Sequence, residues 1–535
     1  MNLLISLLLV AAFFNALSWI ILIPIWQYPD EQAHFAQVQY IAEIGGIPED
    51  NRSFDTSYEV SISEKILGTE RDEAGNNKFT YHPEYKLNFS DSLYGPGEIE
   101  IASLPKSARS ERVKNEATLN PPLYYFLSAQ VYKIFTAGDL FARVYAGRLL
   151  STLFLLLTIF LAFKTGQLIF KNNEILPITL AALVSFKPML VFSSTGVLPD
   201  ILTIFLFSLF IYLSLTIIRD RFTILRAIAI FLVIVLGAAT RQNFLITLFI
   251  FPFVVLHQFV FNKKSRLTIL VTITIFAISL FIASYFVPAL DFIHRFDYPE
   301  SSRKIADNPL ANLSYFDHLR WTMRHTIAEV WPWYWGVYKW LSLTLPPIVY
   351  QIINRLIPLA VIGLVIKLFL IIKKKEVKVN SGVFFLIFTS VVYFFAITTF
   401  DYLHRKNNGY SFGIQGRYFF PVIIPQLALL VFGFSKIFEI VTKKFAKFGF
   451  FLLIVLFFVF NNFSLAYVSA SYYSTSTLNT FLSHASYYKP EIFKGHIILV
   501  ILVATIIFQT IFLIILYKYL IQKRRYIINQ NESHK

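Results

Sequence analysis

The chain has 535 residues, of which 56% are hydrophobic and 15% charged, and its net charge is +16. A mean hydropathy of +0.59 and apolar runs near the roughly 20 residues that cross a bilayer core predict a polytopic membrane protein. With no cysteine, disulfide bonds and thiolate sites are excluded. Nucleic-acid binding is excluded because the basic residues lie in short loops between apolar runs, as in proteins oriented by cytoplasmic lysine and arginine.

The apolar runs predict an all-α fold of about twelve transmembrane helices in a single domain, 1–535. Twelve is an even number of spans, so with the basic loops inside, both termini lie in the cytoplasm. We expect the protein in the inner (plasma) membrane of the cell. The predicted spans lie at 3–25, 148–169, 175–193, 200–218, 227–240, 243–261, 267–290, 346–371, 382–400, 418–435, 448–468 and 496–517.

Two long connections, 26–147 and 291–345, are expected on the extracytoplasmic side. The part 26–120 contains 17 acidic and 9 basic residues, a net charge of −8 in a basic protein, which favours that placement. The run 121–136 is short and interrupted by polar residues, so we expect an interfacial amphipathic helix there. Counting it as a span would instead place the N-terminus outside.

A cluster of ionisable residues follows the first predicted span directly. Asp30 and Glu31 are adjacent carboxylates, and His34 lies four residues after Asp30, on the same face of a helix. Charged groups are costly next to hydrocarbon, so such a cluster is a candidate functional site. The alternative is an ordinary helix start, where a proline and acidic side chains complement the helix dipole.

A second carboxylate, Asp200, follows Pro199 at the start of another predicted span and is expected at the same membrane face. One of the carboxylates could act as a general base while the other orients a nucleophile or an ion. Helix capping is again the alternative for Asp200. The candidate catalytic residues are therefore Asp30, Glu31 and Asp200. A divalent metal remains possible at these residues and His34, but nothing in their spacing requires one.

Two arginines are candidates for binding a phosphate. Arg241 lies between two short apolar runs, at the level of lipid phosphates, and bidentate phosphate recognition suits its guanidinium. It could equally extend to any lipid headgroup. Arg417 lies at the mouth of a span in Gln415-Gly416-Arg417, where Gln415 is a further binding candidate and the glycine allows the backbone to approach a ligand.

Four of the seven tryptophans lie in the segment 331–340. Of these, Trp333 and Trp335 are candidates for stacking on a sugar. An aromatic belt at the membrane interface explains the same residues without a ligand.

Several short motifs lie in the first half of the chain. They are Pro29-Asp30-Glu31 with His34-Phe35, Asn120-Pro121-Pro122-Leu123-Tyr124-Tyr125, Ala142-Arg143, Gly147-Arg148 and Pro199-Asp200. Together they resemble the GT-C glycosyltransferases, polytopic enzymes such as protein O-mannosyltransferases and the aminoarabinose transferase of lipid A, and the resemblance covers roughly 1–260. Gln415-Gly416-Arg417-Tyr418 and the Asp-Glu-x-x-His-Phe pattern are closer to a family of bacterial membrane proteins in that superfamily.

The resemblance implies that Asp30 corresponds to the catalytic carboxylate of the first loop and Asp200 to the acidic residue of the second. It implies a polyprenyl-phosphate-linked sugar donor and a glycan, lipid or protein acceptor on the extracytoplasmic face. Transfer to asparagine is not implied, because the large C-terminal domain of oligosaccharyltransferases is missing. Two other enzymatic readings are a polysaccharide polymerase and a ligase, both using a polyprenyl-diphosphate donor. A lipid or solute transporter and a membrane scaffold remain non-enzymatic alternatives.

Overall fold

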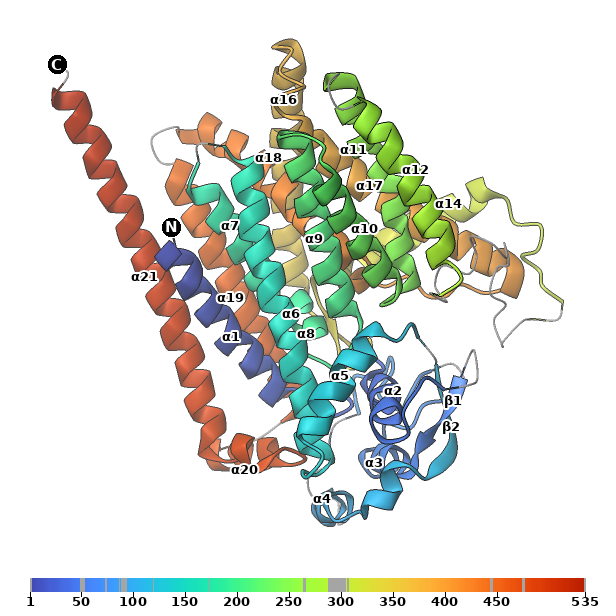
Figure 1. Ribbon diagram of the computed structural model, residues 1–535. Coiled ribbons are helices and arrows are strands. Elements are labelled where there is room, and N and C mark those ends of the chain that lie inside the picture. The colour runs from blue at the N-terminus through green and yellow to red at the C-terminus, as the bar shows by residue number, and fades with distance from the viewer. Residues whose placement is uncertain are drawn as a thin grey trace.

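Long helices form most of the chain in the computed structural model, as Figure 1 shows. In the described residues, ten helices are long and apolar enough to cross a membrane. They are α1 (Asn2–Leu22), α6 (Leu140–Ile169), α9 (Asp200–Arg219), η2 (Gln242–Ile246) with α11 (Thr247–Phe261), α12 (Arg266–Ala283), α16 (Pro347–Lys373), α17 (Ser381–Asn408), η6 (Gly416–Val422) with α18 (Ile423–Thr442), α19 (Ala446–Tyr472) and α21 (His496–Ser533). The structure describes 2–48, 53–72, 75–85, 87, 94–118, 120–171, 173–262, 266–286, 305, 307–442, 446–473 and 477–533.

The prediction of a polytopic all-α membrane protein is confirmed, with two local differences from regular spans. The predicted run 175–193 is a bent pair, α7 (Ile175–Ser185) and α8 (Pro188–Ser194), with an angle of 60° between the two helices. Pro188 explains the break, because proline disfavours a helical conformation in the residue before it. The run 227–240 is α10 (Ile224–Ala238), an apolar helix of 15 residues. The last residues of the predicted span 267–290 lie outside the described residues.

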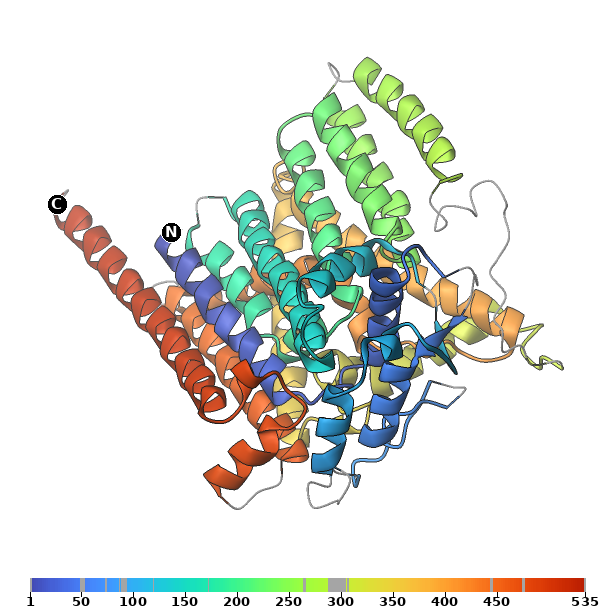
Figure 2. The ribbon, with the colours of Figure 1, turned by 60° about the horizontal axis from the view of Figure 1, so that its bottom comes forward.

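The connection between α1 and α6 forms a small layer across one end of the helix bundle (Figure 1, bottom). Figure 2 brings this end forward. Two short strands pair antiparallel, with Ser53 opposite Thr118. The elements are α2 (Glu31–Glu43), β1 (Ser53–Ser57), α3 (Tyr58–Leu67), α4 (Tyr94–Ala102), η1 (Lys106–Arg109), β2 (Arg112–Thr118) and α5 (Leu123–Ile134). We call this end of the bundle the loop end.

Helix α5 occupies the run 121–136, for which an interfacial helix was predicted. Its 12 residues span about 18 Å at 1.5 Å each, well short of a bilayer core of about 30 Å. It packs against α2 of the layer and against α6. Its length and packing therefore agree with a helix that does not cross the membrane.

The other connections supply short elements as well. Between α12 and α16 lie α14 (Tyr315–His325), a π-helical turn η5 (Thr326–Val330), α15 (Trp331–Trp335), β3 (Val337–Tyr338) and β4 (Leu343–Thr344). Between α19 and α21 lie α20 (Leu478–Ser486) and η7 (Glu491–Phe493). α15 packs against η6 and α8, which brings this connection next to the start of α18.

Close helix packing and buried polar contacts hold the helices of the bundle together. α16 and α18 meet at glycines, since a Cβ at Gly433 would collide with the carbonyl oxygen of Ala360. Helices α1 and α19 are joined by Asn461, whose side-chain amide donates a hydrogen bond of 2.6 Å to Asn15. Small residues and interhelical hydrogen bonds are the usual means of helix association in membranes.

Candidate active site at the loop end

Asp30 lies between α1 and α2 in an unusual backbone conformation. Its φ of 56° and ψ of 17° are left-handed, which is uncommon for a residue other than glycine, although aspartate tolerates it better than most. Asp30 occupies the N-cap position of α2, but its side chain makes no capping hydrogen bond. Its side chain is 38% exposed. The carboxylate is therefore not used to start the helix, and it remains accessible.

Arg417 brings the two predicted carboxylates into one cluster. Its Nη2 lies 3.5 Å from an Asp30 oxygen, and its Nη1 lies 3.9 Å from an Asp200 oxygen. Asp200 also pairs with Arg241, whose Nη2 is 3.0 Å from the carboxylate. Gln415 accepts a hydrogen bond of 2.9 Å from Nε of Arg417 and so orients the guanidinium. We call Asp30, Asp200, Arg241 and Arg417 the carboxylate–guanidinium cluster.

A third guanidinium, which the sequence analysis missed, belongs to Arg71 in the segment after α3. Its Nη1 lies 3.9 Å from Asp30, and its Nε lies 3.9 Å from Glu64. The side chain is largely buried. Arg71 lies within a long connection and outside any apolar run, so no pattern in the sequence marks it. With Arg71, three cations surround two carboxylates.

His34 borders the cluster from the first turn of α2. Its Nδ1 and the hydroxyl of Tyr125 are joined by a hydrogen bond of 2.8 Å. Burial, with further contributions from Arg241, Arg417 and Arg71, lowers the pKa of His34 well below its usual value. The ring is therefore neutral at neutral pH. Among the residues that the structure describes, no group of three or more His, Asp or Glu side chains is placed to hold a metal ion.

Glu31 lies in a different environment from its neighbour Asp30. It is fully buried, and its oxygens accept hydrogen bonds of 2.8 and 2.6 Å from Nε and Nη2 of Arg148. The same oxygens also accept hydrogen bonds from the backbone N–H groups of Trp26 and Val197. These contacts fix the turn after α1 against α6 and the segment before α9. Glu31 is therefore engaged in buried contacts that hold this turn in position, and the catalytic role expected from the sequence stays a prediction.

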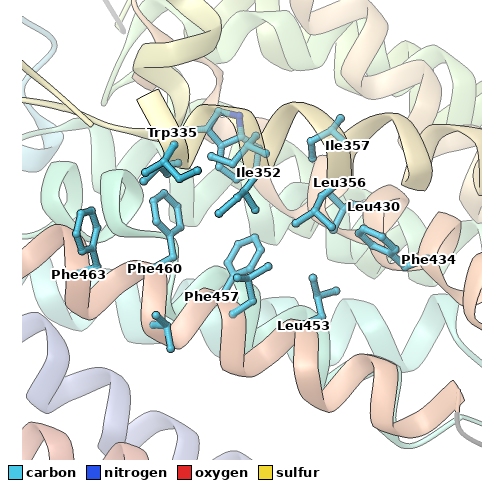
Figure 3. Close-up of a pocket in the computed structure, with 15 residues that line it drawn as sticks. Trp335, Ile352, Leu356, Ile357, Leu430, Phe434, Leu453, Phe457, Phe460 and Phe463 are labelled. Carbon is cyan, nitrogen blue, oxygen red and sulfur yellow. The ribbon is translucent and has the colours of Figure 1, made fainter. Parts of the chain in front are cut away.

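The predicted stacking tryptophans, Trp333 and Trp335, are both buried. Trp335 packs on Lys187, whose Nζ lies 3.8 Å from the ring centroid. Its ring also lines one end of an apolar cavity of about 240 Å³ between α16, α18 and α19 (Figure 3). Trp335 is therefore committed to packing, and an open sugar-stacking face on it is not observed.

Gly416 also has a different role from the expected one. A Cβ at this position would collide with the backbone nitrogen of Tyr334 in α15. The glycine therefore allows η6 to pack closely against α15, which places Arg417, the next residue, in the cluster. The close approach is to the protein's own backbone instead of to a ligand.

The fold and the cluster define a polytopic membrane protein with a charged site at one end of its helix bundle. Residues 13–425 match the model of a family described as predicted membrane protein (DUF2142), and the chain belongs to that family. No curated protein matches the sequence.

Solved structures of two kinds resemble the chain. Archaeal oligosaccharyltransferase AglB from Archaeoglobus fulgidus, in complex with an inhibitory peptide and a dolichol-phosphate, is 11% identical, with a TM-score of 0.44. That match covers 89% of this chain and 56% of the oligosaccharyltransferase, so the chain spans little more than half of that protein's length. ArnT from Cupriavidus metallidurans, bound to undecaprenyl phosphate, is 12% identical, with a TM-score of 0.39 over 93% of this chain and 77% of that one. Both are of the class that the sequence resemblance predicted.

Proposed function

We propose that the protein is a membrane glycosyltransferase that moves a sugar from a polyprenyl-phosphate-linked donor to a cell-envelope acceptor. The observation that carries this proposal is the contact of Arg417 with both Asp30 and Asp200. It joins a candidate base to candidate phosphate-binding groups at the end of a membrane bundle. The sequence resemblance to GT-C enzymes supports the same reaction, which we place on the extracytoplasmic face.

In the proposed reaction, Asp30 is the general base. Its carboxylate is more exposed than that of Asp200, 38% against 19%, and its ion contacts are longer than the 3.0 Å contact of Asp200. It is therefore the carboxylate more available to a substrate hydroxyl. Asp200 holds Arg241 and Arg417 in place, and we assign it a positioning role.

The step is an inverting displacement. Asp30 takes the proton of an acceptor hydroxyl, and the oxygen attacks the anomeric carbon from the face opposite the phosphate. The bond between that carbon and the phosphate oxygen breaks, and its electron pair leaves with the polyprenyl phosphate. The negative charge that develops there is stabilised by the guanidinium groups of Arg417, Arg241 and Arg71, which are already in place before the reaction. The acceptor's proton then leaves Asp30 for water.

A donor with a single phosphate is what the sequence resemblance implies. The three guanidiniums of the site face three carboxylates, because Arg71 contacts Glu64 as well as Asp30. A phosphate of the donor would compete with these carboxylates for the guanidiniums. The polyprenyl-diphosphate polymerase or ligase, whose donor carries a second phosphate, is the second candidate.

The test is transfer in proteoliposomes that contain the full-length protein and a radiolabelled polyprenyl-phosphate sugar or its diphosphate counterpart. A new glycosidic bond formed from the monophosphate donor supports the proposal. Transfer from the diphosphate donor alone would assign the polymerase or ligase reaction. Movement of the labelled lipid across the bilayer without a new bond would instead identify a transporter.

A further inference from the structure

A second cavity lies at the end of the bundle opposite the carboxylate–guanidinium cluster. Asp200 begins α9 and Arg219 ends it, so the 20 residues of this helix separate the two sites by about 30 Å. The cavity has a volume of about 420 Å³, within the range of pockets that bind small molecules. It is lined by the ends of α6, α9 and α11 and by the start of α17.

Most of the charge on the cavity lining is positive. Lys171, Arg219 and Lys378 come from three separate segments of the chain. The acidic lining residue, Asp220, is paired with Arg226 at 2.7 Å, and Arg226 does not line the cavity. The lining therefore has an excess of cations that its own carboxylate does not balance.

His257 also lines the cavity, from α11. Both of its ring nitrogens are buried without a hydrogen-bond partner among the described residues, so a ligand would reach them after the ring turns toward the cavity. An unpaired buried polar group costs free energy, so such groups normally have a partner. A neutral imidazole can donate one hydrogen bond to a phosphate oxygen. The N-terminal residues of α17, Ser381 and Gly382, line the same cavity, and a helix N-terminus also favours an anion.

Apolar side chains complete the lining, among them Leu215 and Ile218 of α9 and Phe261 of α11. We propose that this cavity binds the phosphate headgroup of an anionic phospholipid in the leaflet at this end of the bundle. Basic pockets between transmembrane helices are a known form of headgroup site. The apolar lining at the helix ends favours a lipid over a soluble phosphate compound. This proposal does not depend on the transferase reaction.

The test is lipid retention by the full-length protein in nanodiscs of phosphatidylcholine mixed with phosphatidylglycerol, followed by detergent extraction and mass spectrometry. Wild type is expected to retain phosphatidylglycerol selectively. Each lost cation should weaken its retention about fivefold, so Arg219→Gln with Lys378→Gln should weaken it about 25-fold. Lys374→Gln is the matched control, because this exposed lysine is close in sequence to Lys378 but does not line the cavity.

His257→Phe separates a built site from general attraction between a basic surface and anionic lipid. It keeps an aromatic ring and changes no charge, yet it should also weaken retention of phosphatidylglycerol. Equal retention by wild type and all cavity variants would overturn the proposal. So would displacement of the lipid by glycerol phosphate or inorganic phosphate, because the cavity would then belong to a soluble anion. If the double variant does not fold, Lys378→Gln alone supplies the comparison.

Discussion

Asp30→Asn is the most direct test of the proposed mechanism. Asparagine keeps the size of the side chain and, like aspartate, tolerates the left-handed conformation at this position. What it removes is the ability to accept a proton. The substitution should therefore stop sugar transfer while leaving the fold intact.

The size of both effects follows from the geometry. General base catalysis contributes about 10²–10⁴-fold to a rate, so the barrier should rise by about 2.7–5.4 kcal/mol. The effect on stability should be below about 1 kcal/mol, because Asp30 is partly exposed and its contacts with Arg417 and Arg71 are 3.5 and 3.9 Å long. The loss should appear in kcat, with little change in KM for the donor.

The assay is transfer from a polyprenyl-phosphate sugar in proteoliposomes, with thermal unfolding in detergent measured on the same preparations. Asp55→Asn is the matched control, because Asp55 is an exposed carboxylate on β1 at the same end of the bundle. Asp55→Asn should transfer sugar at the wild-type rate. If Asp30→Asn retained more than about a tenth of the wild-type rate, Asp30 would not be the base.

Four further substitutions test the remaining assignments. Glu31→Gln should destabilise the protein by about 3–5 kcal/mol, because it leaves the buried guanidinium of Arg148 without its carboxylate partner. The folded fraction should keep its turnover. A stable but inactive Glu31→Gln protein would instead assign Glu31 a catalytic role. Arg417→Gln should lower kcat about 10²–10³-fold in the same transfer assay, and an unchanged kcat would remove Arg417 from the phosphate site. The lowered pKa of His34 keeps the ring neutral in the folded state, so the free energy of unfolding should fall by up to about 1.4 kcal/mol per pH unit below about pH 6.5. His34→Gln should lessen this fall when thermal unfolding is measured against pH. An unaltered pH profile would contradict the assignment of a lowered pKa to His34. Burial lowers the pKa of Lys489 to about 7, so the charged lysine destabilises the folded state. Lys489→Met should therefore raise Tm, most at or below pH 7 and less as the pH rises toward 10.5. A rise in Tm that does not depend on pH would point to packing alone.

The membrane fold could be predicted from the sequence because its signal is local. A run of apolar side chains long enough to cross a bilayer forms a helix wherever it later packs, since every backbone polar group must be satisfied within the segment. The sequence also marked Asp30, Asp200, Arg241 and Arg417, because charged residues at the ends of apolar runs are costly and stand out. In the part of the chain that the structure describes, the break at Lys187-Pro188 and the short α10 altered the predicted spans.

The environment of each site residue depended on partners distant in the sequence. Asp30 and Glu31 are adjacent, yet one is partly exposed beside Arg417 and the other is buried on Arg148. Asp30 and Arg417 are 387 positions apart, and the packing of η6 against several helices, α9 and α15 among them, brings them together. Arg71 joined the site without any local signal. The sequence by itself determined which segments enter the membrane, because hydrophobic transfer is a property of each segment. The tertiary structure alone decided which charges meet, because ion pairing depends on distances between segments that no local pattern encodes.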